Sequence, residues 1–285
     1  MSSPAHLYLD LMKRTLLDTP YIDDPLALYA LPRSRAQRSA WKNALLQQVE
    51  TALKGTNFRV VEKQLIYSPG AGIAEARETG MDWPARAHTM IGLKRLNNLQ
   101  MCAESVIKDG VPGDFIETGV WRGGACIFMR ALLKVYEETA RRVWVADSFE
   151  GLPPPDEANY AADAGDTHYL AKPFLAVSRA DVERNFRAYD LLDDQVRFLE
   201  GWFKDTLPTA PIERLAILRL DGDMYESTIQ ALEALYDKLS PGGFVIVDDF
   251  FLKPCAQAVH EFRAARGISD PIMDIDDCGS YWRRS

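Results

Sequence analysis

The segment DFIETGVWRGGACIFMR spans residues 114–130. Its first part, residues 114–119, predicts a buried strand, and residues 125–139 predict the helix that follows. Gly119 and Gly123 lie between the two, where glycine lets the backbone turn tightly and approach a ligand closely. A strand, a glycine-rich turn and a helix in this order indicate the first unit of a parallel α/β sheet.

Short apolar runs and amphipathic runs continue to alternate on both sides of this segment. Strands are predicted over residues 142–148, 196–201, 215–221 and 244–249, and helices over residues 86–110, 178–189, 226–239 and 255–267. A final antiparallel pair is predicted over residues 272–276 and 281–284. The central strands are almost continuously apolar, as expected for a sheet that is covered on both faces. We therefore expect a doubly wound sheet with its ligand at the carboxyl ends of the strands.

The N-terminal part of the chain lacks this alternation. We predict that residues 1–80 form a helical appendage or lid and that residues 81–285 form the catalytic domain. Within the first part, the pattern predicts helices over residues 7–17 and 40–55, an extended run over residues 58–67 and a loop over residues 68–72.

Composition excludes several classes of protein. The chain has 285 residues, of which 47% are hydrophobic and 26% charged, as is typical of a globular enzyme. Its net charge of −8 argues against a nucleic-acid partner, because phosphate binding needs basic patches. No signal peptide or membrane span is visible, and the four cysteines form no Cys-x-x-Cys pair, so we expect a cytoplasmic protein with reduced thiols.

Residues that follow the first three strands suggest a nucleotide-like ligand. Asp147 follows the second strand, where a carboxylate can accept hydrogen bonds from both hydroxyls of a ribose. The glycine-rich turn places the N–H groups of a helix start toward the ligand, although its spacing differs from the G-x-G-x-x-G fingerprint. After the third strand, Trp202 and Phe203 could stack on an adenine or pack in the core. Together these features indicate a ribose-bearing cofactor, and a nicotinamide oxidoreductase is the competing interpretation.

Four aspartates follow the fourth and fifth strands. Asp221 and Asp223 end the fourth strand, and Asp248 and Asp249 end the fifth. Neighbouring strands lie about 4.8 Å apart, so three of these carboxylates would repel one another unless a cation lay between them. Hard oxygen ligands favour Mg²⁺, and the chain offers no His/Cys set for zinc. The fourth acidic residue is then a cap or a solvated loop residue.

The loop over residues 151–177 is long and polar, and it leaves the same edge of the sheet. Loops of this kind often cover an active site and exclude water, although a disordered surface loop is the plain alternative. The loop contains His168, which, like the other three histidines, we interpret as a surface or core residue.

Several of these segments resemble the macrocin O-methyltransferase family, whose members methylate sugar hydroxyls of natural products. The resemblance rests on FIETGVWRGGACIFMR (115–130), VWVADSFEGLP (143–153), RLDGDMYEST (219–228), PGGFVIVDDF (241–250), DWPARAHTMIG (82–92) and YLDLM (8–12). It implies a Rossmann-like class I methyltransferase fold with a seven-stranded, mostly parallel sheet. It also implies S-adenosylmethionine as the methyl donor and a homo-oligomer, a dimer or larger.

The resemblance also implies roles for individual residues. The methionine end of the donor would be lined by Glu117, Gly119 and Gly123, and Thr118, Trp121 and Arg122 of the same loop are further donor-binding candidates. The ribose would be held by Asp147 and Ser148, the adenine would lie near Gly201 and Trp202, and the donor would be covered by Thr89 and Met90. Mg²⁺ would be bound by Asp221, Asp248 and Asp249, with Asp221 also placed to act as the base.

A metal-assisted transfer predicts a particular acceptor. A hydroxyl bound to Mg²⁺ has a lowered pKa and a fixed position, and a nearby carboxylate can take its proton. Two adjacent hydroxyls could chelate the ion, so we expect a vicinal diol on a glycosylated small molecule. A catechol or small phenol is the alternative acceptor, and a non-catalytic protein that binds S-adenosylmethionine is the alternative of another class.

Overall fold

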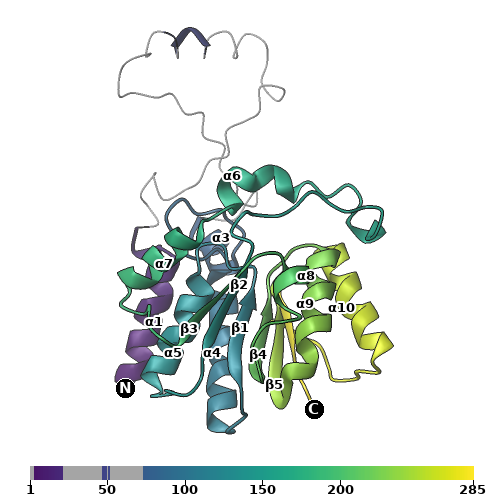
Figure 1. Ribbon diagram of the computed structural model, residues 1–285. Helices are drawn as coiled ribbons and strands as arrows, with labels where there is room; N and C mark the ends of the chain where they lie inside the picture. The colour runs from purple at the N-terminus through teal and green to yellow at the C-terminus, as the bar shows by residue number, and fades with distance from the viewer. Residues whose placement is uncertain (1–2, 22–46, 50, 52–72) are drawn as a thin grey trace.

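The computed structural model describes residues 3–21, 47–49, 51 and 73–285 (Figure 1). The helix predicted over residues 40–55 lies almost wholly outside these residues, and the segments predicted over residues 58–67 and 68–72 lie wholly outside them. Among the described residues, no helix combines the length and the apolar character needed to span a bilayer.

One seven-stranded sheet organises the described residues, with the strand order β3-β2-β1-β4-β5-β7-β6. Five parallel strands form its centre: β1 (Asp114–Thr118), β2 (Val143–Asp147), β3 (Val196–Glu200), β4 (Leu215–Leu220) and β5 (Leu239–Val247). Two short strands at one edge, β6 (Met273–Asp274) and β7 (Ser280–Arg283), pair antiparallel to each other, and β7 pairs antiparallel to β5. The predicted mostly parallel sheet and its antiparallel end are therefore confirmed. The strand order reverses between β1 and β4, which places the ligand crevice there.

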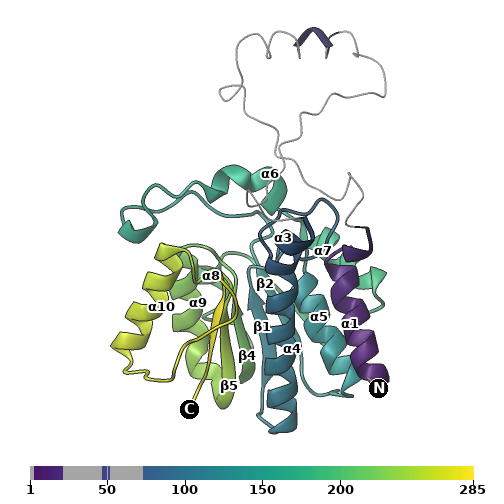
Figure 2. The same cartoon turned by 180° about the vertical axis from the view of Figure 1, so that it is seen from behind.

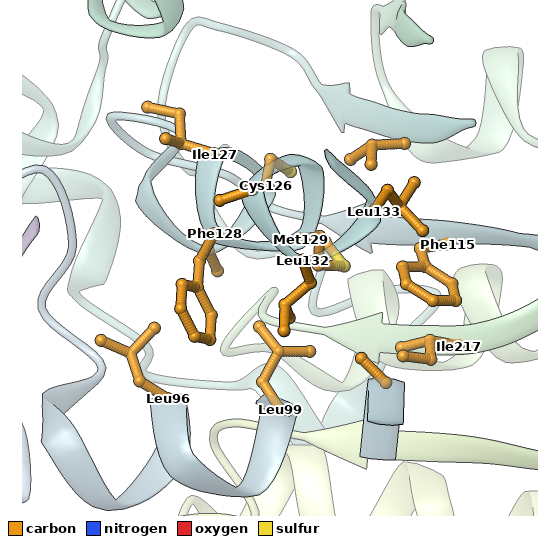
Figure 3. Close-up of a cluster of buried hydrophobic side chains, with 14 of the residues drawn as sticks. Leu96, Leu99, Phe115, Cys126, Ile127, Phe128, Met129, Leu132, Leu133 and Ile217 are labelled. Atoms are coloured by element: carbon orange, nitrogen blue, oxygen red, sulfur yellow. The ribbon is translucent and has the colours of Figure 1, made fainter. Parts of the chain in front are cut away.

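Helices cover both faces of the sheet (Figures 1 and 2). One face carries α1 (Pro4–Leu16), α4 (Gly92–Lys108), α5 (Gly124–Val135) and α7 (Arg179–Ala188), and the other carries α9 (Tyr225–Leu235) and α10 (Lys253–Ala265). On the first face, apolar residues of α4 and α5 meet Phe115 of β1 and Ile217 of β4 in one core (Figure 3). The shorter helices are η1 (Thr19–Tyr21), α3 (Ile73–Thr79), η4 (Ala161–Asp163), η5 (His168–Ala171), α6 (Lys172–Leu175), α8 (Phe203–Thr206) and η6 (Tyr236–Lys238).

Two predicted boundaries were wrong by five residues or more. The helix predicted from residue 86 begins only at Gly92, because Gly92 has a φ of +76°, and a right-handed helix cannot continue through that conformation. Strand β5 begins at Leu239, five residues before the predicted start at 244, because its first residues pair with β4 across a register shift.

Helix α1 belongs to the main core. Leu9 and Leu16 are fully buried in the cluster that also contains the apolar residues of α4 and α5. Helix α3, which also precedes residue 81, packs against α4. Helices α1 and α3 of the first part thus each contact the second part, and the division into residues 1–80 and 81–285 stays a prediction.

We expect Leu9→Ala to lower the free energy of unfolding by about 2–5 kcal/mol, since it removes a buried side chain and leaves a cavity. Leu11→Ala on the same helix is the matched control, because Leu11 is 58% exposed and Leu9 is 0% exposed. Urea denaturation measures both. Equal, small losses would show that α1 does not contribute to the core.

Candidate functional site

A cavity of about 800 Å³ lies at the carboxyl ends of the central strands. Its wall includes residues that directly follow β1, β2, β4 and β5, which is where a doubly wound sheet binds its ligand. Eleven of the fifteen candidate site residues line it: Thr89, Met90, Glu117, Gly119, Trp121, Asp147, Ser148, Trp202, Asp221, Asp248 and Asp249.

The other four candidates do not line this cavity: Thr118, Arg122, Gly123 and Gly201. The hydroxyl of Thr118 donates to the Arg219 carbonyl within the sheet. The guanidinium of Arg122 donates to the carbonyls of Pro84 and Ala87, so it holds the segment before α4 in place. Direct contact between these four residues and the donor stays a prediction.

The end of β1 approaches the end of β4 so closely that only glycine fits there. Gly119 has a φ of +87°, and a Cβ at this position would lie 1.8 Å from the carbonyl oxygen of Asp221. The glycine therefore brings the predicted donor loop and the predicted metal residues to one point of the cavity.

Asp147 is held rigidly at the end of β2. Its two carboxylate oxygens accept hydrogen bonds from the N–H groups of Val120 and Phe149, each at 2.7 Å. Burial raises the pKa of Asp147, and these backbone donors act against that rise. Each oxygen keeps a second lone pair, so the fixed carboxylate can still accept the hydroxyls of a ribose.

The three predicted metal residues come together. Asp221, Asp248 and Asp249 each offer one carboxylate oxygen, and these oxygens lie within 4.8 Å of one another. One carboxylate oxygen of this cluster, Asp249 Oδ2, also accepts a hydrogen bond from the N–H of Asp223 at 3.1 Å. Three hard oxygen donors at this spacing fit a Mg²⁺ ion.

Arg219 of β4 forms ion pairs with carboxylates of this site, and the sequence patterns did not predict this role. Its guanidinium is buried and donates to Glu117 Oε1, to Asp221 Oδ2 and to Asp248 Oδ1. Three strands thus contribute carboxylates to one arginine. The signal was the lone arginine in the apolar run LAILRL, because a buried arginine requires acidic partners.

Arg95 of α4 is the second buried cation, and it was also missed. It donates to Asp248 Oδ2 and, through Nε at 3.2 Å, to Asp276 Oδ2. Both oxygens of Asp248 therefore accept from an arginine. These contacts fix the Asp248 carboxylate before any ligand binds.

Acidic groups outnumber the arginines in this cluster. Burial, together with the neighbouring carboxylate of Asp221, raises the pKa of Asp223 to about 7. The same two causes raise the pKa of Asp248 to about 6, against the opposing effect of Arg95 and Arg219. Burial also raises the pKa of Asp249 well above its usual range. A divalent cation would relieve this repulsion, so the residues present fit the predicted metal.

The loop over residues 151–177 runs over the carboxyl ends of the strands (Figures 1 and 2). Buried Asp163 in this loop accepts the N–H groups of Tyr225 and Glu226 at 2.7 and 2.9 Å, so it caps the start of α9. Farther along, the ring of Phe174 lies 5.0 Å from that of Trp83 and 5.1 Å from that of Trp121. The loop is therefore anchored on both sides of the cavity, as a cover requires.

His168 lies in the wall of the cavity, which the interpretation as a plain surface or core residue did not anticipate. Its Nδ1 is 2.7 Å from Asp166 Oδ2, and the negative charges of Asp166 and Asp223 raise its pKa against the effect of burial.

Comparison with known proteins gives consistent matches. The family model described as macrocin-O-methyltransferase (TylF) matches residues 5–284. The 8-demethyl-8-(2,3-dimethoxy-alpha-L-rhamnosyl)-tetracenomycin-C 4'-O-methyltransferase of Streptomyces olivaceus is 50% identical over 98% of this chain and 93% of its own. The mycinamicin III 3''-O-methyltransferase of Micromonospora griseorubida is 58% identical over 77% of this chain and 87% of its own.

Solved structures of methyltransferases are also similar to this chain. The O-methyltransferase NovP is 47% identical and covers 99% of both chains with a TM-score of 0.80. The calicheamicin methyltransferase CalS11 is 20% identical, covers 86% of this chain and 93% of its own, and shares the fold with a TM-score of 0.57.

We expect the metal-free protein to lose stability as the pH rises from about 6.5 to 8. Burial raises the pKa of Glu117 from 4.5 to about 8, so in this range the folded chain binds a proton that the unfolded chain lacks. Raising the pH removes that proton and lowers the free energy of unfolding. Urea denaturation in chelator at several pH values measures the slope. Glu117→Gln should reduce the slope without abolishing it, because the raised pKa values of Asp223 and Asp249 contribute in the same direction. An unchanged slope in that variant would contradict the assignment.

Proposed function

Because this chain belongs to the macrocin O-methyltransferase family, and is thus an S-adenosylmethionine-dependent O-methyltransferase of the class I fold, we propose that it methylates a sugar hydroxyl of a glycosylated natural product. Relatives support this acceptor class: one is named for a rhamnosyl-tetracenomycin, one for mycinamicin III and one, 58% identical over 74% of this chain, for demethyldecarbamoylnovobiocin. The nicotinamide oxidoreductase that we considered as a competing interpretation does not agree with this membership.

The observation that carries the proposal is the convergence of Asp221, Asp248 and Asp249 on one point of the cavity wall. We propose that these three residues hold a Mg²⁺ ion. When bound, such an ion lowers the pKa of a coordinated hydroxyl and fixes its position, and it suits a vicinal diol.

Asp221 is the residue best placed to take the acceptor proton. Its side chain is 25% exposed, whereas that of Asp248 is 6% exposed and accepts from arginines at both oxygens. Arg219 holds one oxygen of Asp221 at 2.7 Å, so the other oxygen can face the cavity. A carboxylate oriented in this way can act as a general base within hydrogen-bond reach of the acceptor.

The remaining wall residues would orient the donor. Asp147 and Ser148 would hold its ribose, Trp202 would lie near its adenine, and Glu117 and Gly119 would lie near its methionine end. An in-line transfer requires the acceptor oxygen about 3 Å from the methyl carbon, so this rigidity contributes directly to the rate. The anchored cover, residues 151–177, would exclude water during transfer.

The proposal also covers the partner, the oligomeric state and the location of the protein. A small-molecule partner, without nucleic acid or membrane, agrees with the net charge of −8. A homo-oligomer of two or more copies and a cytoplasmic location remain predictions.

Asp221→Asn and Asp248→Asn should each lower methyl transfer to a vicinal diol by about 10²–10⁴-fold, the usual contribution of a general base or of charge stabilisation. Affinity for S-adenosylhomocysteine should change far less, because neither carboxylate holds the donor. Turnover assays and calorimetry measure the two effects. Asp237→Asn is the control, since this aspartate is 67% exposed, pairs with Arg266 and does not line the cavity. Undiminished turnover in excess chelator would show that methyl transfer does not need a metal ion.

Asp163→Ala should loosen the cover and raise the KM for the acceptor. The Asp163 carboxylate joins the cover to the start of α9, and losing such a helix cap costs about 0.5–2 kcal/mol. Limited proteolysis should then cut faster within residues 151–177. Ser178→Ala is the matched control, since it removes the cap of α7, where Ser178 accepts the Asp181 N–H at 3.2 Å outside the cavity wall. An unchanged KM together with unchanged proteolysis would show that Asp163 does not hold a cover.

A further inference from the structure

Phe251 is an unusual residue for a folded domain. The residue is 53% exposed. Among the phenylalanines, tyrosines and tryptophans whose burial the structure describes, it is the only exposed one. It also lines the cavity. An exposed aromatic ring beside a ligand cavity is a common mark of a binding surface.

The ring belongs to a wall made by three segments that are distant in the sequence. The N–H of Phe251 donates to the Cys278 carbonyl at 3.0 Å, and Cys278 Sγ lies 3.5 Å from Met81 Sδ. Met81 is 39% exposed, and with Leu252 and Cys278 it also lines the cavity. We call Met81, Phe251, Leu252 and Cys278 the apolar wall.

The apolar wall is joined directly to the carboxylate cluster. Phe251 follows Asp249 by two residues, and the N–H of Leu252 closes a turn onto the Asp249 carbonyl at 2.9 Å. The backbone of Phe251 is thus fixed on both sides, by this turn and by the Cys278 carbonyl. A molecule whose hydroxyl reaches Asp221 would therefore have its neighbouring portion against this wall.

Polar side chains also line the cavity. His168, Glu226 and Gln230 line it from the cover and from α9, together with the aspartates. A sugar can satisfy such groups with its hydroxyls, but an apolar wall offers it no hydrogen bonds. The two surfaces match a molecule that is polar at one end and apolar at the other.

We propose that the apolar wall binds the aglycone of the glycoside acceptor and that Phe251 makes the enzyme prefer a sugar attached to an apolar ring system over the same sugar without one. This inference rests on the proposed function. It adds a residue that selects the acceptor without taking part in the chemistry.

The test compares two acceptors that share one sugar: 4-methylumbelliferyl α-L-rhamnoside, which carries a flat aromatic group, and methyl α-L-rhamnoside, which carries none. The wild type should show the higher kcat/KM with the aryl glycoside. Phe251→Ala should lower that kcat/KM roughly tenfold or more, as expected for losing the burial of a phenyl ring. The methyl glycoside should be affected less than about twofold, within the usual effect of a surface substitution.

Two further variants control the result. Phe251→Trp should keep the preference for the aryl glycoside, because it keeps a large aromatic face. Met273→Ala should change neither acceptor, since Met273 is 50% exposed but lies outside the cavity wall. The unfolding midpoint should stay unchanged in Phe251→Ala, because the ring is exposed. Affinity for S-adenosylhomocysteine should also stay unchanged, because Phe251 follows Asp249 and is not one of the proposed donor-binding residues.

Other outcomes would overturn the inference. Equal losses for both acceptors would mean that the sugar itself lies on Phe251, and a changed oligomeric state of Phe251→Ala in light scattering would mean that a second copy covers the ring. Equal kcat/KM for both acceptors in the wild type would show that the apolar wall does not bind the aglycone, and it would leave the proposed function intact. Transfer to catechol but to neither glycoside would instead overturn the proposed function.

Discussion

The site depends on one buried arginine. Arg219 of β4 holds Glu117, Asp221 and Asp248, which come from the ends of three adjacent strands. Removing one partner of a buried ion pair typically costs about 3–5 kcal/mol, because the other charge stays buried without compensation. The strand order β1-β4-β5 places the three carboxylates close together, and the positive charge of Arg219 offsets the repulsion between them.

This arrangement also explains why the donor region and the carboxylate cluster share one cavity. Glu117 at the end of β1 and Asp221 after β4 accept from the same nitrogen of Arg219, and Gly119 lets the two strand ends touch. Arg95 then connects Asp248 to Asp276 in the segment before β7. The acids outnumber these two cations, which is the physical reason to expect a divalent ion. The apolar wall around Phe251 continues from the same turn that carries Asp249.

Much of this could be predicted from the sequence, because the relevant signals are local. Alternating apolar runs gave the sheet, and the rule that ligands bind at strand ends brought Asp147, Asp221 and Asp248 to one edge. Arg95, Asp163 and Phe251 were missed because their roles depend on partners that are distant in the sequence. The start of α4 was misplaced because the apolar pattern runs on through Gly92, whereas the folded chain gives this glycine a φ of +76° that ends a right-handed helix. A separate resemblance to the macrocin O-methyltransferase family supplied the acceptor class, which no local pattern contains.

The central claim is that Asp221, Asp248 and Asp249 converge on one cation beside the donor. The most direct measurement is a crystal structure with Mn²⁺ and S-adenosylhomocysteine, in which anomalous scattering locates the metal. The account predicts one anomalous peak bound by oxygens of all three aspartates, with Arg219 still paired to Glu117. A peak elsewhere, or none at a saturating Mn²⁺ concentration, would contradict it.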